Sequence, residues 1–207
     1  MAHHIDSQIN RLLEKYAGLL VRPSTIDQDF RDDDDVRIVG TFAFTSISTP
    51  HLPELDVAYE VKLIVPRRFP RALVRAYSVQ GAIPRDYHTN PGGDLCLGVL
   101  VELHALLRRC PTVLGFAELC LVPYLYRRRH IELFNQPPWG ELEHGARGLL
   151  QYYAREFGMD KADVCAQLLG LGGRRKRTAN KQLCPCRSGR RLGQCHHMRV
   201  NCLRAKC

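Results

Sequence analysis

The chain has 207 residues, of which 45% are hydrophobic and 25% charged. This balance excludes wholesale disorder and collagen-like or low-complexity architecture, and the length suits one domain with an appendage or two small domains. No apolar stretch reaches the roughly 18 residues of a membrane span, and the first residues lack the basic-then-apolar pattern of a secretion signal. These features predict a cytoplasmic protein without a membrane segment.

The net charge of +9 is unevenly distributed along the sequence. Residues 171–207 contain 11 Lys or Arg and no Asp or Glu, whereas residues 1–170 contain 19 basic and 21 acidic residues and carry −2. The chain is therefore a nearly neutral body followed by a basic tail. Such a tail suits nucleic acid, an acidic partner, an anionic membrane surface or a purely solubilising role.

The hydrophobic pattern of the body predicts a helix, then strands, then further helices. Strict or near-strict alternation of apolar residues predicts strands at 36–47, 57–65 and 73–79. Helical spacing predicts helices at 5–20, 112–127, 145–157 and 161–169. Pro123 near the end of the second of these segments predicts a kink or an early stop. This order of elements predicts an α+β fold.

One cysteine of the body, Cys96, follows a Gly-rich loop that also contains His88, Asn90 and Asp94. A thiolate is a strong nucleophile, and a loop can present it at the surface. An Asn amide can stabilise an oxyanion, a His can orient a partner or accept a proton, and Asp94 can assist an attacking amine. In the alternative interpretation, Cys96 is a small buried hydrophobic residue and its neighbours only form turns.

The basic tail contains a Cys-x-Cys pair and a Cys-His pair that are separated by eight residues. The four residues are Cys184, Cys186, Cys195 and His196. Three thiolates and one imidazole make a closed tetrahedral zinc site, which is structural rather than catalytic. His197 is a rival fourth ligand, and we expect zinc to order a tail that is too short to build its own core.

The order of motifs in the body resembles that of the ubiquitin-conjugating enzymes, which carry ubiquitin-like proteins as a thioester on one cysteine. Three stretches carry the resemblance: the proline-flanked turn 66–70, the tripeptide His88-Thr89-Asn90 and the triplet Leu95-Cys96-Leu97. The stretch 138–145 is similar to one in bacterial members of this family, which often sit in antiphage operons. The tail closely resembles the zinc-binding motif at the SecA C-terminus.

The resemblance implies a thioester acyl transferase in which Cys96 accepts an acyl group from a separate adenylating enzyme and passes it to an amine. The implied cargo is a ubiquitin-like protein or the C-terminus of a signalling nucleotidyltransferase. Asn90, His88 and Asp94 are the implied site residues around the thiol, and zinc is the only expected cofactor.

The same interpretation divides the chain into a ubiquitin-conjugating-enzyme-like catalytic domain at 1–170, a basic linker at 171–182 and a zinc module at 183–207. The sequence is also consistent with two alternative functions. In the first, the chain is a non-catalytic protein-binding module of the same fold. In the second, it is a zinc protein that associates with nucleic acid through its basic tail.

Overall fold

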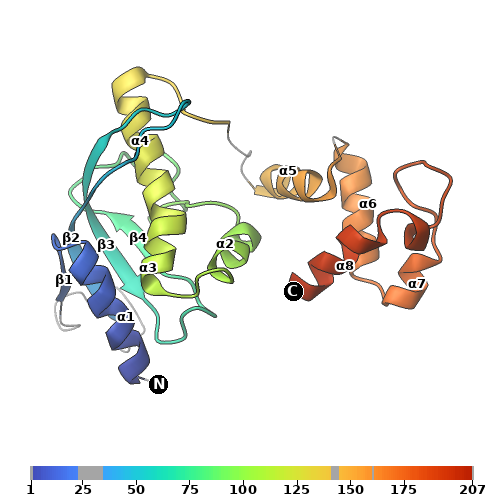
Figure 1. Ribbon diagram of the computed structural model, residues 1–207, viewed down its shortest axis with the longest axis horizontal. Coiled ribbons are helices and arrows are strands. Elements are labelled where there is room, and N and C mark those ends of the chain that lie inside the picture. The colour runs from blue at the N-terminus through green and yellow to red at the C-terminus, as the bar shows by residue number, and fades with distance from the viewer. Residues whose placement is uncertain (1, 23–34, 141–144, 160, 207) are drawn as a thin grey trace. The chain divides into compact units, whose positions relative to one another are not determined.

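The computed structural model describes residues 2–22, 35–140, 145–159 and 161–206. The chain divides into two compact units, Met1–Trp139 and Gly140–Cys207 (Figure 1), and each unit has its own hydrophobic core. In the part of the chain that the structure describes, every helix is too short or too polar to cross a bilayer.

The first unit is built around a four-stranded antiparallel sheet in which strands adjacent in sequence are neighbours. The strands are β1 (Leu19–Arg22), β2 (Val36–Thr45), β3 (Asp56–Val65) and β4 (Arg75–Ser78). Burial in β3 alternates over most of its length, as the strict apolar alternation predicts. The register pairs Val36 with Val65 and Phe42 with Tyr59, so the apolar residues of β2 and β3 share one face.

Helices complete the core of the first unit. They are α1 (Ala2–Lys15), α2 (Leu100–Leu107), α3 (Val113–Phe116), the π-helical turn η2 (Ala117–Leu121) and α4 (Val122–Phe134). The α3–α4 run lies across the sheet (Figure 1), and α1 contacts α3. Ile5, Ile9 and Leu12 of α1 are buried at helical spacing, and the ring of Tyr16 stacks on that of Phe42 with centroids 4.1 Å apart. An α+β fold with an antiparallel sheet is therefore confirmed.

The first helix ends earlier than its apolar spacing predicts. The predicted segment 5–20 stops being helical at Lys15, and Leu19–Arg22 forms β1. Gly18 and Gly40 allow the turn after α1 to approach β2 closely: a Cβ on Gly40 would lie 2.1 Å from the Gly18 carbonyl oxygen. Leu19 then pairs with Gly40, and this strand pairing overrides the local helical spacing.

The helix predicted at 112–127 is longer than expected. The Thr112 hydroxyl caps its first turn, and the helical run continues to Phe134, where Asn135 ends it with a left-handed φ of 53°. Pro123 does not stop the helix, because it lies in the first turn of α4, directly after the π-helical turn η2.

The second unit contains two helices that we expected in the body. Its helices are α5 (Gly145–Phe157), α6 (Ala162–Gly172), α7 (Lys176–Asn180), the 3-10 turn η3 (Leu192–Gln194) and α8 (His197–Lys206). Phe157 and Leu168 from α5 and α6 pack with Leu192 and Val200 from the tail. The boundary between units thus lies after Trp139, not at residue 170.

The predicted basic linker at 171–182 is likewise structured, because it contains the end of α6 and all of α7. The guanidinium of Arg204 from α8 donates to the carbonyl oxygens of Leu171 and Gly172, at 2.7 and 3.0 Å. These bonds satisfy carbonyls at the end of α6 that have no partner within the helix. The tail is therefore packed onto α5 and α6 rather than joined to them by a free linker.

Candidate functional site

The loop that carries Cys96 is closed by its own backbone. The Cys96 N–H donates to the His88 carbonyl at 2.7 Å, and the Asn90 N–H donates to the Asp94 carbonyl at 2.8 Å. Gly93 allows the turn between them, with a φ of +83°. These bonds bring all four residues of the predicted thiol site, Cys96, His88, Asn90 and Asp94, into one short loop.

The side chains of Asn90 and Asp94 bind each other. The amide nitrogen of Asn90 donates to a carboxylate oxygen of Asp94 at 2.7 Å, and both side chains are partly buried. This charge-assisted bond uses one of the two amide N–H groups of Asn90 and leaves the second for another acceptor. In this arrangement Asp94 orients Asn90.

The end of the loop is fixed to the rest of the first unit. Leu95, next to the thiol, is 4% exposed, and its N–H donates to the Ala76 carbonyl of β4 at 2.7 Å. On the other side, the Tyr124 hydroxyl of α4 lies 3.2 Å from the Tyr87 carbonyl oxygen and 3.4 Å from that of His88. The thiol therefore projects from a segment that is held by both the sheet and the long helix.

Tyr124 is a site residue that the sequence patterns did not predict. It is 7% exposed, and burial is the main cause that raises its pKa, so the hydroxyl keeps its proton and can donate. Nearby Tyr87 and Cys96 raise this pKa further. One feature of the sequence could have drawn attention to Tyr124: it is a tyrosine on an otherwise apolar helix face. A hydroxyl that is buried on such a face requires a hydrogen-bond partner.

Cys96 is a partly exposed residue, whereas Cys120 and Cys165 in the two cores are 2% and 0% exposed. The structure does not support the interpretation of Cys96 as a fully buried hydrophobic residue. Burial raises the pKa of Cys120 to about 11 and also raises that of Cys165, so both stay protonated and shielded.

We expect Cys96 to react with iodoacetamide far faster than Cys120 or Cys165, because alkylation needs an accessible thiolate. Peptide mapping after brief labelling of the folded protein at about pH 8 measures this difference. Labelling in guanidinium is the control and should make all three cysteines equally reactive. Equal reactivity in the folded protein would contradict the described burial.

The predicted metal ligands converge in the second unit. The sulfur atoms of Cys184, Cys186 and Cys195 and a ring nitrogen of His196 all lie within 4.8 Å of one another. A short hairpin creates this arrangement: the Cys184 N–H donates to the Arg190 carbonyl at 2.8 Å, and η3 then leads into Cys195.

The spacing of these four atoms suits a tetrahedral metal ion. Zinc–sulfur bonds of about 2.3 Å require ligand atoms about 3.7 Å apart. Nδ1 of His196 lies 3.2 Å from the sulfur of Cys184 and 3.1 Å from that of Cys195, and the sulfurs of Cys186 and Cys195 are 3.5 Å apart. The cluster can therefore hold a metal ion and is compatible with zinc.

The pKa of Cys184 and the positions of the neighbouring residues are also consistent with a metal site at this cluster. Burial raises the pKa of the Cys184 thiol to about 11, and a bound metal ion would favour its ionised form. His197, the rival ligand, is not among the converging residues. Cys202 is exposed on α8, outside the cluster.

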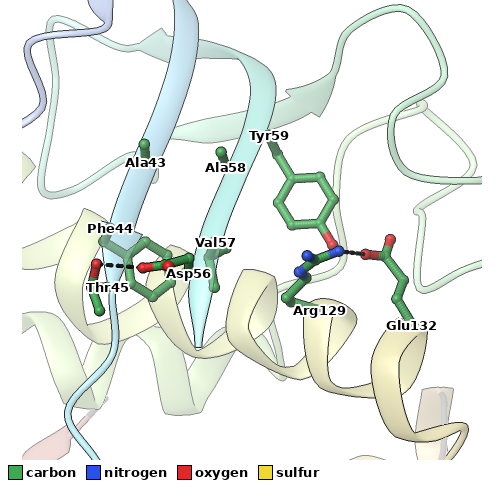
Figure 2. Close-up of a pocket in the computed structure, with 9 residues that line it drawn as sticks. All are labelled: Ala43, Phe44, Thr45, Asp56, Val57, Ala58, Tyr59, Arg129 and Glu132. Atoms are coloured by element: carbon green, nitrogen blue, oxygen red, sulfur yellow. Dashed lines mark hydrogen bonds and ion pairs between the residues drawn. The ribbon is translucent and has the colours of Figure 1, made fainter. Parts of the chain in front are cut away.

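A pocket of about 600 Å³ lies beside the ends of β2 and β3 and the second half of α4 (Figure 2). Its lining consists of Ala43, Phe44, Thr45, Asp56, Val57, Ala58, Tyr59, Arg129 and Glu132. Its polar groups mostly bind each other: the guanidinium of Arg129 lies 3.4 Å from the carboxylate of Glu132, and the Thr45 hydroxyl donates to Asp56 at 2.7 Å. None of the predicted site residues lines this pocket.

The segment after α4 is described only in part. Trp139 packs on Tyr126 with ring centroids 5.7 Å apart and planes inclined by 8°, as expected of a packing anchor. Half of the stretch similar to the bacterial enzymes, residues 141–144 with His144, lies outside the described residues. No protein-family model, curated protein or solved structure matches this chain. The thiol loop and the Cys/His cluster are the candidate sites among the residues that the structure describes.

Proposed function

We propose that this chain is a cysteine-thioester acyl carrier of the ubiquitin-conjugating-enzyme type. The observation that carries the proposal is that Cys96, a partly exposed cysteine, lies at the end of a loop anchored to β4 and α4. The N-terminal helix, antiparallel meander and later helices of the first unit support the same class. The proposed cargo is a ubiquitin-like protein or the C-terminus of a nucleotidyltransferase, and antiphage defence is the proposed setting.

The proposed chemistry consists of two acyl transfers. The Cys96 thiolate attacks the thioester carbonyl of an adenylating enzyme, and the donor cysteine leaves as a thiolate. A target amine then attacks the new thioester, Cys96 leaves as a thiolate, and the amine loses a proton as the amide forms. Neither step requires a metal or a redox partner.

Each neighbour of the thiol has a proposed role in these transfers. The second N–H of Asn90 supplies an oxyanion donor, of a kind whose removal elsewhere costs about 3 kcal/mol. Asp94 acts as a positioning residue through its bond to the Asn90 amide. His88 positions the thiol through its carbonyl, which accepts the Cys96 N–H.

We also propose that zinc is the metal of the Cys/His cluster and that its role is structural. All four ligand positions are supplied by the chain, which leaves no open position for a substrate. The cluster shares the core of the second unit, since Cys184 is buried there with Leu192.

Capture of the cargo tests the proposed function. Tagged full-length protein carrying Cys96→Ser is purified from its native host without reductant and compared with the wild type. We expect the serine variant to accumulate an oxygen ester that is stable enough for the cargo to be sequenced. The host must express the adenylating enzyme for this test to be valid. If neither protein then carries an adduct, the transferase function is excluded, and the chain is instead a non-catalytic binding module of the same fold.

Tyr124→Phe is expected to slow amine discharge of the adduct by about fivefold, since it removes a hydrogen bond of about 1 kcal/mol that fixes the thiol loop. Single-turnover discharge to free lysine measures the rate. Tyr126→Phe is the matched control, because its hydroxyl donates to the Pro53 carbonyl at 2.9 Å, away from the thiol loop. Equal slowing by both substitutions would show that the Tyr124 hydroxyl contributes only to stability.

A further inference from the structure

The division into two units places the entire net charge of the protein on one of them. Residues 140–207 contain 14 Lys or Arg and 5 Asp or Glu, hence +9, whereas residues 1–139 contain 16 of each and are neutral. The thioester chemistry of the first unit does not use this charge. A unit with such an imbalance attracts polyanions over distances of about a Debye length.

Seven basic residues of the second unit form what we call the basic cluster. They are Arg174, Arg175, Lys176, Arg177, Lys181, Arg190 and Arg191. All seven are exposed. Among the residues that the structure describes, no carboxylate lies within ion-pair distance of any of them, in contrast to Arg187, which lies 3.8 Å from Asp163.

The fold brings the two parts of the basic cluster together. Arg174 and Arg175 directly precede α7, and Lys176 and Arg177 are its first two residues. Lys181 directly follows this helix. Leu183 pairs with Arg191 in an antiparallel bridge, and the Leu192 N–H donates to the Gln182 carbonyl at 2.8 Å. This hairpin, which also carries the metal ligand Cys184, sets Arg190 and Arg191 beside the chain that leaves α7.

The chemistry of the basic cluster favours phosphate over an acidic protein surface. Five of the seven residues are arginines, whose planar guanidinium matches phosphate geometry. A protein-docking surface has an apolar and aromatic centre, but Leu149, Leu183 and Met198 are the only exposed large apolar residues described in this unit. None of these is aromatic, so the exposed apolar residues described in this unit offer no platform on which bases can stack.

We propose that the basic cluster binds nucleic acid through its phosphate backbone, without reading the base sequence. This binding is a second function of the chain, independent of the thiol site in the first unit. Its affinity depends strongly on salt, because each phosphate that the protein neutralises releases a counterion.

Fluorescence anisotropy of the full-length protein with a short labelled duplex of mixed sequence tests the proposal. Binding is titrated at several salt concentrations between about 50 and 200 mM. Substitution of Arg174, Arg177, Arg190 and Arg191 by Gln is expected to weaken binding by about tenfold or more. The salt slope should also fall by about 0.9 for each phosphate that the variant no longer neutralises. A second duplex of unrelated sequence should bind equally well.

The matched control removes the same number of charges from the first unit. Arg68, Arg71, Arg85 and Arg109 are also exposed, and their substitution by Gln is expected to change the affinity by less than about twofold. The proposal is overturned if both quadruple variants lose affinity equally or if the wild type does not bind the duplex. Poly-glutamate that competes as well as DNA at equal charge would overturn it in favour of an acidic protein partner.

Discussion

Substitution of the candidate metal ligand Cys195 by Ser is expected to unfold the second unit while the first unit keeps its fold. The site is part of a small core, in which Cys184 is 4% exposed and Leu192 is fully buried. Metal binding contributes roughly 10–16 kcal/mol in zinc peptides, as much as the whole stability of a typical domain. We therefore expect the packing of α5 and α6 on the tail to be insufficient to hold the unit once the metal is removed.

Two measurements detect this effect. Mass spectrometry gives the metal content of the purified protein, and hydrogen exchange gives the amide protection of each peptide. The wild type should hold one zinc per chain and protect amides in α6 and α8, whereas Cys195→Ser should lose both the metal and this protection. Cys202→Ser is the matched control, because Cys202 is a cysteine of the same tail that is exposed and outside the cluster. A Cys195→Ser protein that keeps its protection would show that the apolar core alone folds the unit.

Cys96→Ala is expected to lower thioester formation by a factor of roughly 10³ or more, because covalent catalysis has no route without its nucleophile. The fold should change little, since Cys96 is only partly buried and its backbone bonds remain. The amount of thiol-sensitive adduct on a non-reducing gel measures the effect.

Cys110→Ala is the matched control for this substitution. Cys110 is an exposed thiol in the same unit and lies just before α3. We expect its removal to leave the adduct unchanged. Loss of the adduct in both variants, or in neither, would contradict the assignment of Cys96 as the carrier.

Features set by local spacing could be predicted from the sequence. The apolar residues of β3 alternate strictly, a pattern that is typical of a strand with one buried face. The four candidate metal ligands are close in sequence, so their convergence needs only a short turn, in which Gly189 has a φ of +72°. His88, Asn90 and Asp94 could be predicted as neighbours of Cys96 for the same reason.

Features set by distant partners could not be predicted in this way. Leu19 fits the helical spacing of α1, and only its pairing with Gly40 assigns it to a strand. The apolar faces of α5 and α6 show that both helices pack on a core but not on which one. Tyr124 reaches the loop from 36 residues away; its place on an apolar helix face indicates that its hydroxyl needs a partner but not that the partner is this loop.

Peptide mapping by mass spectrometry of wild-type protein, purified from its host without reductant, shows whether Cys96 carries an acyl group as a thioester. We expect an acyl adduct on the peptide containing Cys96 that disappears after neutral hydroxylamine, with every other cysteine unmodified. An unmodified Cys96, with hydroxylamine-sensitive acyl groups absent or located on other cysteines, would contradict it.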